Sequence, residues 1–146
     1  MTIHIAIQPA PFDLAREVEA LSRDGVGALA TFTGYVRAGD GLTALVLEHY
    51  PGMTEREIAR QAEEAGRRWP LLGVSVIHRV GELKPGEPIV LVAVAAAHRG
   101  DAFAACEFLM DHVKTKATFW KQEKRGGATA WIEAKASDDK AAERWK

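Results

Sequence analysis

Two lysines, Lys114 and Lys121, lie seven residues apart in a segment that also carries aromatic side chains. Seven residues make two helical turns, so a helix through this segment would place both amines on nearly the same face, about 10 Å apart along the axis. Lys116, Lys124 and Arg125 add positive charge nearby, although the whole chain has a formal charge of only -1. A local cationic cluster is typical of a site for an anionic ligand. Cations also stabilise the C-terminal end of a helix without any ligand.

Further cationic side chains stand where predicted strands end. His98 and Arg99 follow the apolar run 89–97 and precede a predicted helix, whose first N–H groups lack partners within the helix. A guanidinium there can bind phosphate or carboxylate with two hydrogen bonds, or it can pair with a surface carboxylate. His98 can orient a ligand or transfer a proton, or it can be a hydrogen-bonded structural histidine. Arg37 ends another predicted strand, where it either faces the same ligand or is solvated.

The single cysteine, Cys106, excludes an intramolecular disulfide and cannot build a zinc site. It falls on the apolar stripe of the predicted helix, so we expect a small buried side chain and no nucleophile. The other members of that stripe are Phe103, Leu109, Met110 and Val113. His49 and His78 lie on predicted strands without metal-ligand spacing, so we expect structural roles for them. The glycine pattern of a phosphate-binding loop is absent, and we expect neither a metal nor a cofactor.

The elements that must position these side chains alternate between strands and helices. Strands are predicted over residues 3–7, 28–36, 42–50, 74–80, 89–97 and 128–134. One helix is predicted after the cap Asp13 and one from Thr54 towards Trp69. A third helix is predicted from the cap Asp101 through Lys121, and a last short one after the cap Ser137. The segments 28–36 and 42–50 look like a hairpin. The run 89–97 is apolar on both faces, which predicts a central strand. The fold class is α+β, with mixed and antiparallel sheets.

Length and composition indicate one domain over 1–146. The 19 basic and 20 acidic residues almost balance, which argues against nucleic-acid binding. The N-terminus lacks the pattern of a signal peptide, and the longest apolar run is too short to cross a membrane. We therefore expect a cytoplasmic protein that binds neither nucleic acid nor membrane.

Sequence strings spread over the whole chain carry a family resemblance. They are 31–37 (TFTGYVR), 47–53 (LEHYPGM), 77–83 (IHRVGEL), 97–99 (AHR), 109–111 (LMD), 114–115 (KT), 119–121 (FWK), 131–134 (WIEA) and 144–145 (RW). Through these strings the chain resembles the MoaE family, the large catalytic subunits of molybdopterin synthase, from about residue 3 to residue 145. Two small departures are a turn after Arg37 that looks short and Thr118, which stands where a proline is common.

The resemblance implies an α/β-hammerhead fold and a homodimer that binds two copies of a small ubiquitin-like sulfur carrier, giving a heterotetramer. In that family the carrier's C-terminal Gly-Gly thiocarboxylate enters a pocket of the large subunit. Two sulfurs then pass to cyclic pyranopterin monophosphate and form the dithiolene of molybdopterin. The family's two functional lysines fall on Lys114 and Lys121. Its substrate-contacting residues fall on these two lysines and on Tyr35, Val36, Arg37, His98, Arg99, Gln122 and Glu123.

The residue chemistry agrees with sulfur transfer, because cationic side chains suit an anionic pterin phosphate and the carrier brings its own sulfur. Two other functions stay open at this point. One is a Schiff-base lysine enzyme acting on a phosphorylated carbonyl compound. The other is a module that only holds a ubiquitin-like partner.

Overall fold

The computed structural model describes residues 1–117, 119–132 and 136–146. Within these residues, four helices and eight strands follow one another. They are β1 (Thr2–Gln8), α1 (Leu14–Leu21), β2 (Ala28–Tyr35), β3 (Leu42–His49), α2 (Met53–Arg68), β4 (Leu71–Arg79), β5 (Gly81–Leu83), β6 (Pro88–Ala96), α3 (Arg99–Thr115), β7 (Phe119–Arg125), β8 (Ala128–Ile132) and α4 (Ala136–Glu143). Among the described residues, no helix is both long and apolar enough to span a membrane.

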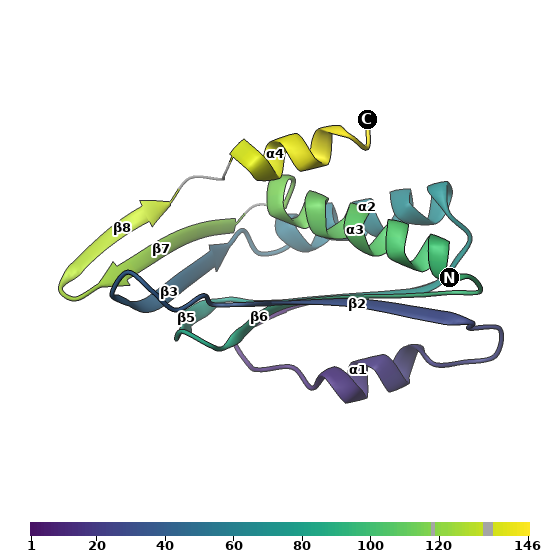
Figure 1. Ribbon diagram of the computed structural model, residues 1–146, viewed down its shortest axis with the longest axis horizontal. Helices are drawn as coiled ribbons and strands as arrows, with labels where there is room; N and C mark the ends of the chain where they lie inside the picture. The colour runs from purple at the N-terminus through teal and green to yellow at the C-terminus, as the bar shows by residue number, and fades with distance from the viewer. Residues whose placement is uncertain (118, 133–135) are drawn as a thin grey trace.

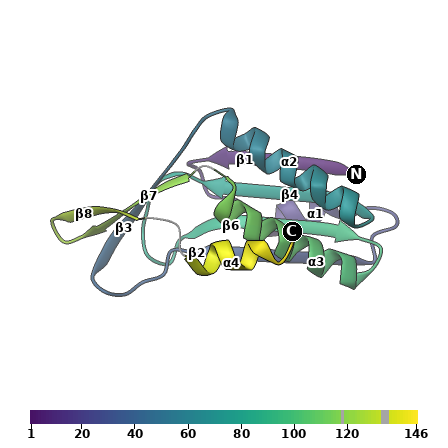
Figure 2. The ribbon, with the colours of Figure 1, turned by 90° about the horizontal axis from the view of Figure 1, so that it is seen from above.

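The larger sheet has the strand order β1-β4-β6-β2, in which β1 and β4 are parallel and the other pairs antiparallel. Strand β6 is internal and all of its residues from Val90 to Ala96 are buried, as its two apolar faces predict. Helices α2 and α3 cover one face of this sheet and α1 covers the other (Figure 1). Seen from above, α2 lies over β1 and β4, and α3 lies over β6 and β2 (Figure 2). The core of the molecule lies between α2, α3 and this sheet.

The smaller sheet has the order β5-β3-β7-β8, with every neighbouring pair antiparallel. It lies beyond the end of the larger sheet at which β2 finishes and β6 begins (Figure 1). A small core of Val36, Leu45, Leu47 and Leu83 joins it to the end of β2. The two sheets and four helices confirm the predicted α+β class with mixed and antiparallel sheets.

The predicted hairpin of 28–36 and 42–50 is wrong, because the two strands belong to different sheets. Strand β2 pairs with β6 from Ala28 to Tyr35, whereas β3 pairs with β5 and β7. Between them Gly39, Asp40 and Gly41 have positive φ angles of 137°, 51° and 71°. These left-handed conformations turn the chain out of the larger sheet and into the smaller one.

The predicted helix through Lys121 is also wrong. Helix α3 ends at Thr115, where the N–H groups of Lys116 and Ala117 both donate to the carbonyl of His112, at 2.7 and 3.4 Å. Lys121 lies on β7 instead. The last part of the predicted strand 128–134 falls outside the described residues, as does Thr118.

Two details of α3 differ from the prediction. The helix begins at Arg99 with His98 as its N-cap, so Asp101 lies in the first turn and is not the cap. Phe103 is 66% exposed and does not belong to the buried stripe, whereas Cys106, Leu109, Met110 and Val113 are buried. Phe103 lies near the start of α3 and lines a cavity between this helix and the edge strand β2.

Candidate active site

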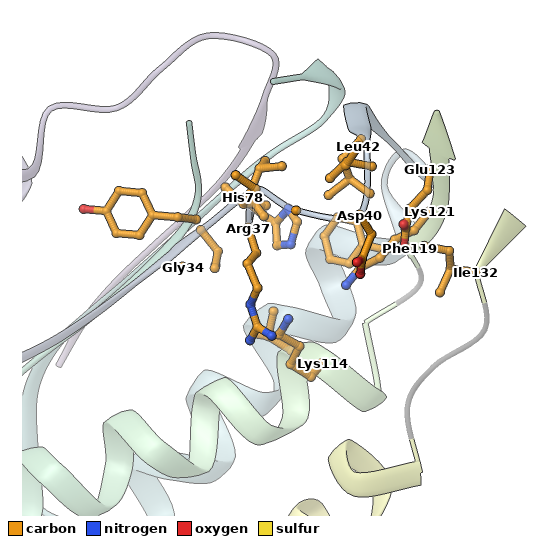
Figure 3. Close-up of a pocket in the computed structure, with 18 of the residues that line it drawn as sticks. Gly34, Arg37, Asp40, Leu42, His78, Lys114, Phe119, Lys121, Glu123 and Ile132 are labelled. Atoms are coloured by element: carbon orange, nitrogen blue, oxygen red, sulfur yellow. The ribbon is translucent and has the colours of Figure 1, made fainter. Parts of the chain in front are cut away.

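A cavity of about 590 Å³ lies where the two sheets meet. Its walls are the end of β2 with the turn that follows, the end of α3, and one face of β7 (Figure 3). Four cationic side chains and two carboxylates line it: Arg37, Lys114, Lys121 and Arg125, with Asp40 and Glu123. This excess of positive charge suits an anionic ligand.

Arg37 reaches the cavity because the residue before it is held in place. The N–H of Val36 donates to the carbonyl of Glu87 at 2.9 Å, and the N–H of Gly86 donates back to the carbonyl of Val36 at 2.8 Å. Val36 itself is only 2% exposed and packs with the small core. The chain therefore leaves β2 at a fixed point, and the Arg37 side chain extends from it towards Lys114 (Figure 3).

The turn after Arg37 is tied to the far side of the cavity. The Nε atom of Arg125 donates to the carbonyl of Asp40 at 3.0 Å. The same guanidinium lies against the carboxylate of Glu123, which faces the cavity two residues earlier on β7. Arg125 thus links the turn to β7 and neutralises part of the negative charge in the cavity.

Lys114 enters the cavity from the last turn of α3. The preceding residue, Val113, is 3% exposed and anchors this turn in the core, whereas Lys114 is exposed. The carbonyl groups at the end of a helix carry negative partial charge, so an ammonium group is stabilised there. Lys116 is exposed as well, but it is not among the described residues that line the cavity.

Lys121 enters the same cavity from β7, where it pairs with Leu47 of β3 and Ile132 of β8. Because side chains alternate along a strand, Lys121 shares its face with Phe119 and Glu123. Gln122 lies on the opposite face and does not line the cavity. The two lysines therefore meet as predicted, but from a helix end and a strand rather than from one helix face.

His78, for which we predicted a purely structural role, lies in the wall of this cavity at the end of β4. It is 6% exposed, its Nδ1 lies 2.8 Å from the carbonyl oxygen of Arg79, and its ring stacks on Phe119 with centroids 3.9 Å apart. Burial, together with the charges of Lys121, Lys114 and His49, lowers the pKa of His78 to about 4. No spacing in the sequence indicates this position, because the approach of β4 to β7 is a tertiary contact.

His98 and Arg99 lie elsewhere, exposed at the start of α3. Fifteen residues of helix separate Arg99 from Lys114, which amounts to about 22 Å along the axis. Within one chain the structure therefore brings together six of the predicted site residues and leaves His98, Arg99 and Gln122 outside. The six are Tyr35, Val36, Arg37, Lys114, Lys121 and Glu123.

Metal-binding chemistry finds no support in the described part of the chain. No group of three or more histidine, cysteine, aspartate or glutamate side chains there could hold a metal ion. Most of the charged groups of the cavity are instead ammonium and guanidinium groups, which bind anions and donate hydrogen bonds.

Cys106 lies in a second cavity of about 580 Å³ between β2 and α3, away from the two lysines. Burial raises the pKa of its thiol to about 11, so the reactive thiolate is scarce at neutral pH. We expect Cys106→Ala to keep most of the activity of the chain, with at most a modest loss of packing free energy. Loss of activity in a Cys106→Ala protein that melts like the original would contradict this expectation.

Comparison with known proteins finds relatives that match the chain over nearly its whole length. The MoaE protein family matches residues 7–116. The chain is 49% identical over 147 residues to the molybdopterin synthase catalytic subunit of Pseudomonas aeruginosa, covering 97% of this chain and 98% of that protein. It is 52% identical over 145 residues to the subunit of the same name from Escherichia coli, covering 97% of each.

The fold has a close counterpart among solved structures. Molybdopterin cofactor biosynthesis protein E from Burkholderia multivorans superposes with a TM-score of 0.86 at 49% sequence identity, over 99% of this chain and 97% of that one. This likeness confirms the predicted α/β-hammerhead fold.

Proposed function

The chain belongs to the MoaE protein family, and from this we propose that it is the catalytic subunit of a molybdopterin synthase. It transfers two sulfurs from the thiocarboxylated C-terminus of a small ubiquitin-like carrier to cyclic pyranopterin monophosphate, which forms the dithiolene of molybdopterin. The observation that carries this function is the cationic cavity in which Arg37, Lys114 and Lys121 converge.

The cavity fits the chemistry of both reactants. The substrate is an anionic cyclic phosphate and the carrier tail ends in an anionic thiocarboxylate, so both are attracted by the same cations. In each transfer the thiocarboxylate sulfur forms a bond to a carbon of the substrate. Water then adds to the carrier's carbonyl carbon, so negative charge develops on the carbonyl oxygen. The bond between that carbon and sulfur breaks, which leaves the sulfur on the substrate and a carboxylate on the carrier. Lys114, in the last turn of α3, stabilises the charge on the carbonyl oxygen or donates a proton. Lys121 helps to hold the substrate.

The chain supplies no sulfur of its own in this scheme, because its only cysteine is buried outside the cavity. The sulfur arrives on the carrier, and the enzyme's part is to position the two reactants and to move protons. We propose that residues 1–146 act as one domain, without a resident metal or cofactor, in the cytoplasm.

A homodimer accounts for the two predicted site residues that lie far from the cavity. Strand β2 is an edge strand of the larger sheet, and its outer edge has no partner strand among the described residues. Phe32, Tyr35 and Phe103 are 41%, 58% and 66% exposed beside it. An unpaired edge flanked by exposed aromatic side chains is suited to pairing with a second copy of the chain.

Antiparallel pairing of two β2 strands about a two-fold axis would complete the site. It places the start of one β2, at Ala28, beside the end of the other, at Tyr35. Ala28 pairs with Ala96, which immediately precedes the segment that carries His98 and Arg99. We therefore propose that His98 and Arg99 of the second copy reach the cavity that contains Lys114 and bind the phosphate and pterin end of the substrate.

Single-turnover sulfur transfer tests the proposed function. The chain, mixed with thiocarboxylated carrier and cyclic pyranopterin monophosphate, should form molybdopterin, and a carrier without its final Gly-Gly should support no turnover. Binding of the carrier without any transfer would instead indicate a module that only holds its partner. A substrate adduct on a lysine that borohydride traps would indicate Schiff-base chemistry.

A further inference from the structure

We propose that His78 is a positioning residue of this cavity, whose unprotonated Nε2 accepts a hydrogen bond from the ammonium group of Lys121 when the reactants are bound. The proposal rests on the proposed function, because it assigns His78 a part in the same sulfur transfer. His78 is a buried residue in the wall of the cavity. Neither the spacing of residues in the sequence nor the composition of the chain indicates this position.

The hydrogen bond at Nδ1 fixes which ring nitrogen carries the proton. Nδ1 of His78 lies 2.8 Å from the carbonyl oxygen of Arg79, and a carbonyl oxygen can only accept. Nδ1 is therefore the protonated nitrogen of the neutral ring, and Nε2 carries a lone pair. A neutral His78 thus presents a hydrogen-bond acceptor rather than a donor on its other side.

Packing fixes the orientation of the ring that carries this lone pair. The ring of His78 is buried and stacks on Phe119 at an interplanar angle of 20°. Phe119 and Lys121 are two residues apart on β7 and share the face that lines the cavity. The contact that orients the His78 ring is therefore made by the same strand face that delivers Lys121, so the two side chains are placed by one element.

The charges around the ring keep it neutral. Lys121 of β7, Lys114 of α3 and His49 of β3 all act on His78, and together with burial they favour the uncharged imidazole, with a pKa of about 4. At neutral pH such a ring is unprotonated and only weakly basic, so it presents a hydrogen-bond acceptor to its neighbours. It remains a hydrogen-bond acceptor over the whole pH range in which the enzyme would work.

An uncharged acceptor has a specific use in this cavity. Lys114, Lys121 and Arg37 repel one another, and a flexible lysine side chain can adopt many rotamers. A fixed lone pair selects the rotamers of Lys121 that point its ammonium group into the cavity. Loss of that acceptor should therefore lower kcat more than it raises KM, because the reactants still find the cations but one cation is misplaced.

Two substitutions of His78 distinguish the contribution of the acceptor Nε2 from that of the rest of the ring. In His78→Gln the side-chain amide oxygen can take the place of Nε2, whereas the shorter side chain of His78→Asn can replace only Nδ1 and its bond to Arg79. We expect kcat of His78→Asn to fall roughly ten- to a hundredfold below that of His78→Gln, the range for losing a hydrogen bond to a charged group. Equal kcat values in two variants with equal melting temperatures would overturn the proposal.

His112 provides a matched control. Its Nδ1 also lies 2.8 Å from a carbonyl oxygen, that of Phe108, and its ring packs on an aromatic ring at 4.2 Å, but it does not line the cavity. His112→Asn should keep the original kcat. In a Lys121→Ala background the difference between His78→Gln and His78→Asn should disappear, because the donor is gone. A difference of unchanged size would assign the effect to something other than Lys121.

Spectroscopy tests the proposal separately from the reaction. Long-range ¹H–¹⁵N spectra of the complete chain should show one protonated and one bare nitrogen in the His78 ring from about pH 5 to pH 8. A proton on Nε2, or a doubly protonated ring at pH 7, would overturn the proposal even if sulfur transfer is confirmed. Conversely, the expected spectrum with no sulfur transfer by the original chain would count against the proposed function alone.

Discussion

Replacement of Lys114 by alanine is expected to lower single-turnover sulfur transfer by about 10²-fold or more. This is the range for loss of a general acid or of a donor that stabilises a developing oxyanion. Lys114 stands on a helix turn that Val113 anchors in the core, so its backbone is held at the edge of the cavity. The measurement is formation of product from carrier that is thiocarboxylated beforehand, with enzyme in excess.

Lys116→Ala is the matched control, because Lys116 carries the same charge two residues further along and does not line the cavity. It should leave the rate nearly unchanged, whereas Lys121→Ala should lower it. If Lys116→Ala is inactive while Lys114→Ala and Lys121→Ala behave normally, the reaction does not take place in this cavity.

Mixing two inactive variants is expected to restore activity. In a dimer with sites shared between copies, Lys114→Ala and Arg99→Ala each damage both sites. Arg99→Ala alone should lose roughly ten- to a hundredfold, the range for a charge-assisted hydrogen bond. A mixed dimer of the two variants combines an intact Lys114 from one copy with an intact Arg99 from the other in one of its two sites. Refolding equal amounts together should therefore recover about a quarter of the original activity, since half of the dimers are mixed.

The control for mixing is Arg60→Ala, on the exposed side of α2 where Arg60 pairs with Glu57. It should be active by itself, and mixing it with Lys114→Ala should only dilute activity. If the mixture of Lys114→Ala and Arg99→Ala stays as inactive as its components, or if the chain is strictly monomeric, then Arg99 does not act across a dimer.

Local patterns in the sequence predicted the individual strands and helices well, but they predicted poorly which strands pair with one another. The central position of β6 follows from an apolar run on both faces, and Asp13 caps α1 as predicted, accepting from the N–H of Arg16. The pairing of β2 with β6 and of β3 with β7 has no local signal, because it joins segments that lie far apart in the chain. A short glycine-rich turn between two strand-like segments predicts a hairpin unless a tertiary contact overrides it, and here one does.

For the candidate site as well, the sequence indicated the residue types correctly but not the elements that bring them together. The types of Arg37, Lys114 and Lys121 indicated an anion site, and the structure brings all three to one cavity. The helical spacing from which that convergence was expected does not exist, because the chain changes from helix to strand between Thr115 and Phe119. His78 was missed since its place in the cavity wall depends on a stacking contact between β4 and β7.

The smaller sheet consists of strands that lie far apart in the sequence and therefore leave the ribosome at different times. Strand β3 is complete at residue 49, but β7, which covers almost its whole length, begins only at residue 119. A nascent chain therefore carries β3 with one edge uncovered through about 70 further residues of synthesis. The larger sheet, α3 and Lys114 are all in place by residue 115, yet Lys121, Phe119 and the far wall of the cavity come afterwards. The enzyme thus remains without its pocket until the last fifth of the chain has been made.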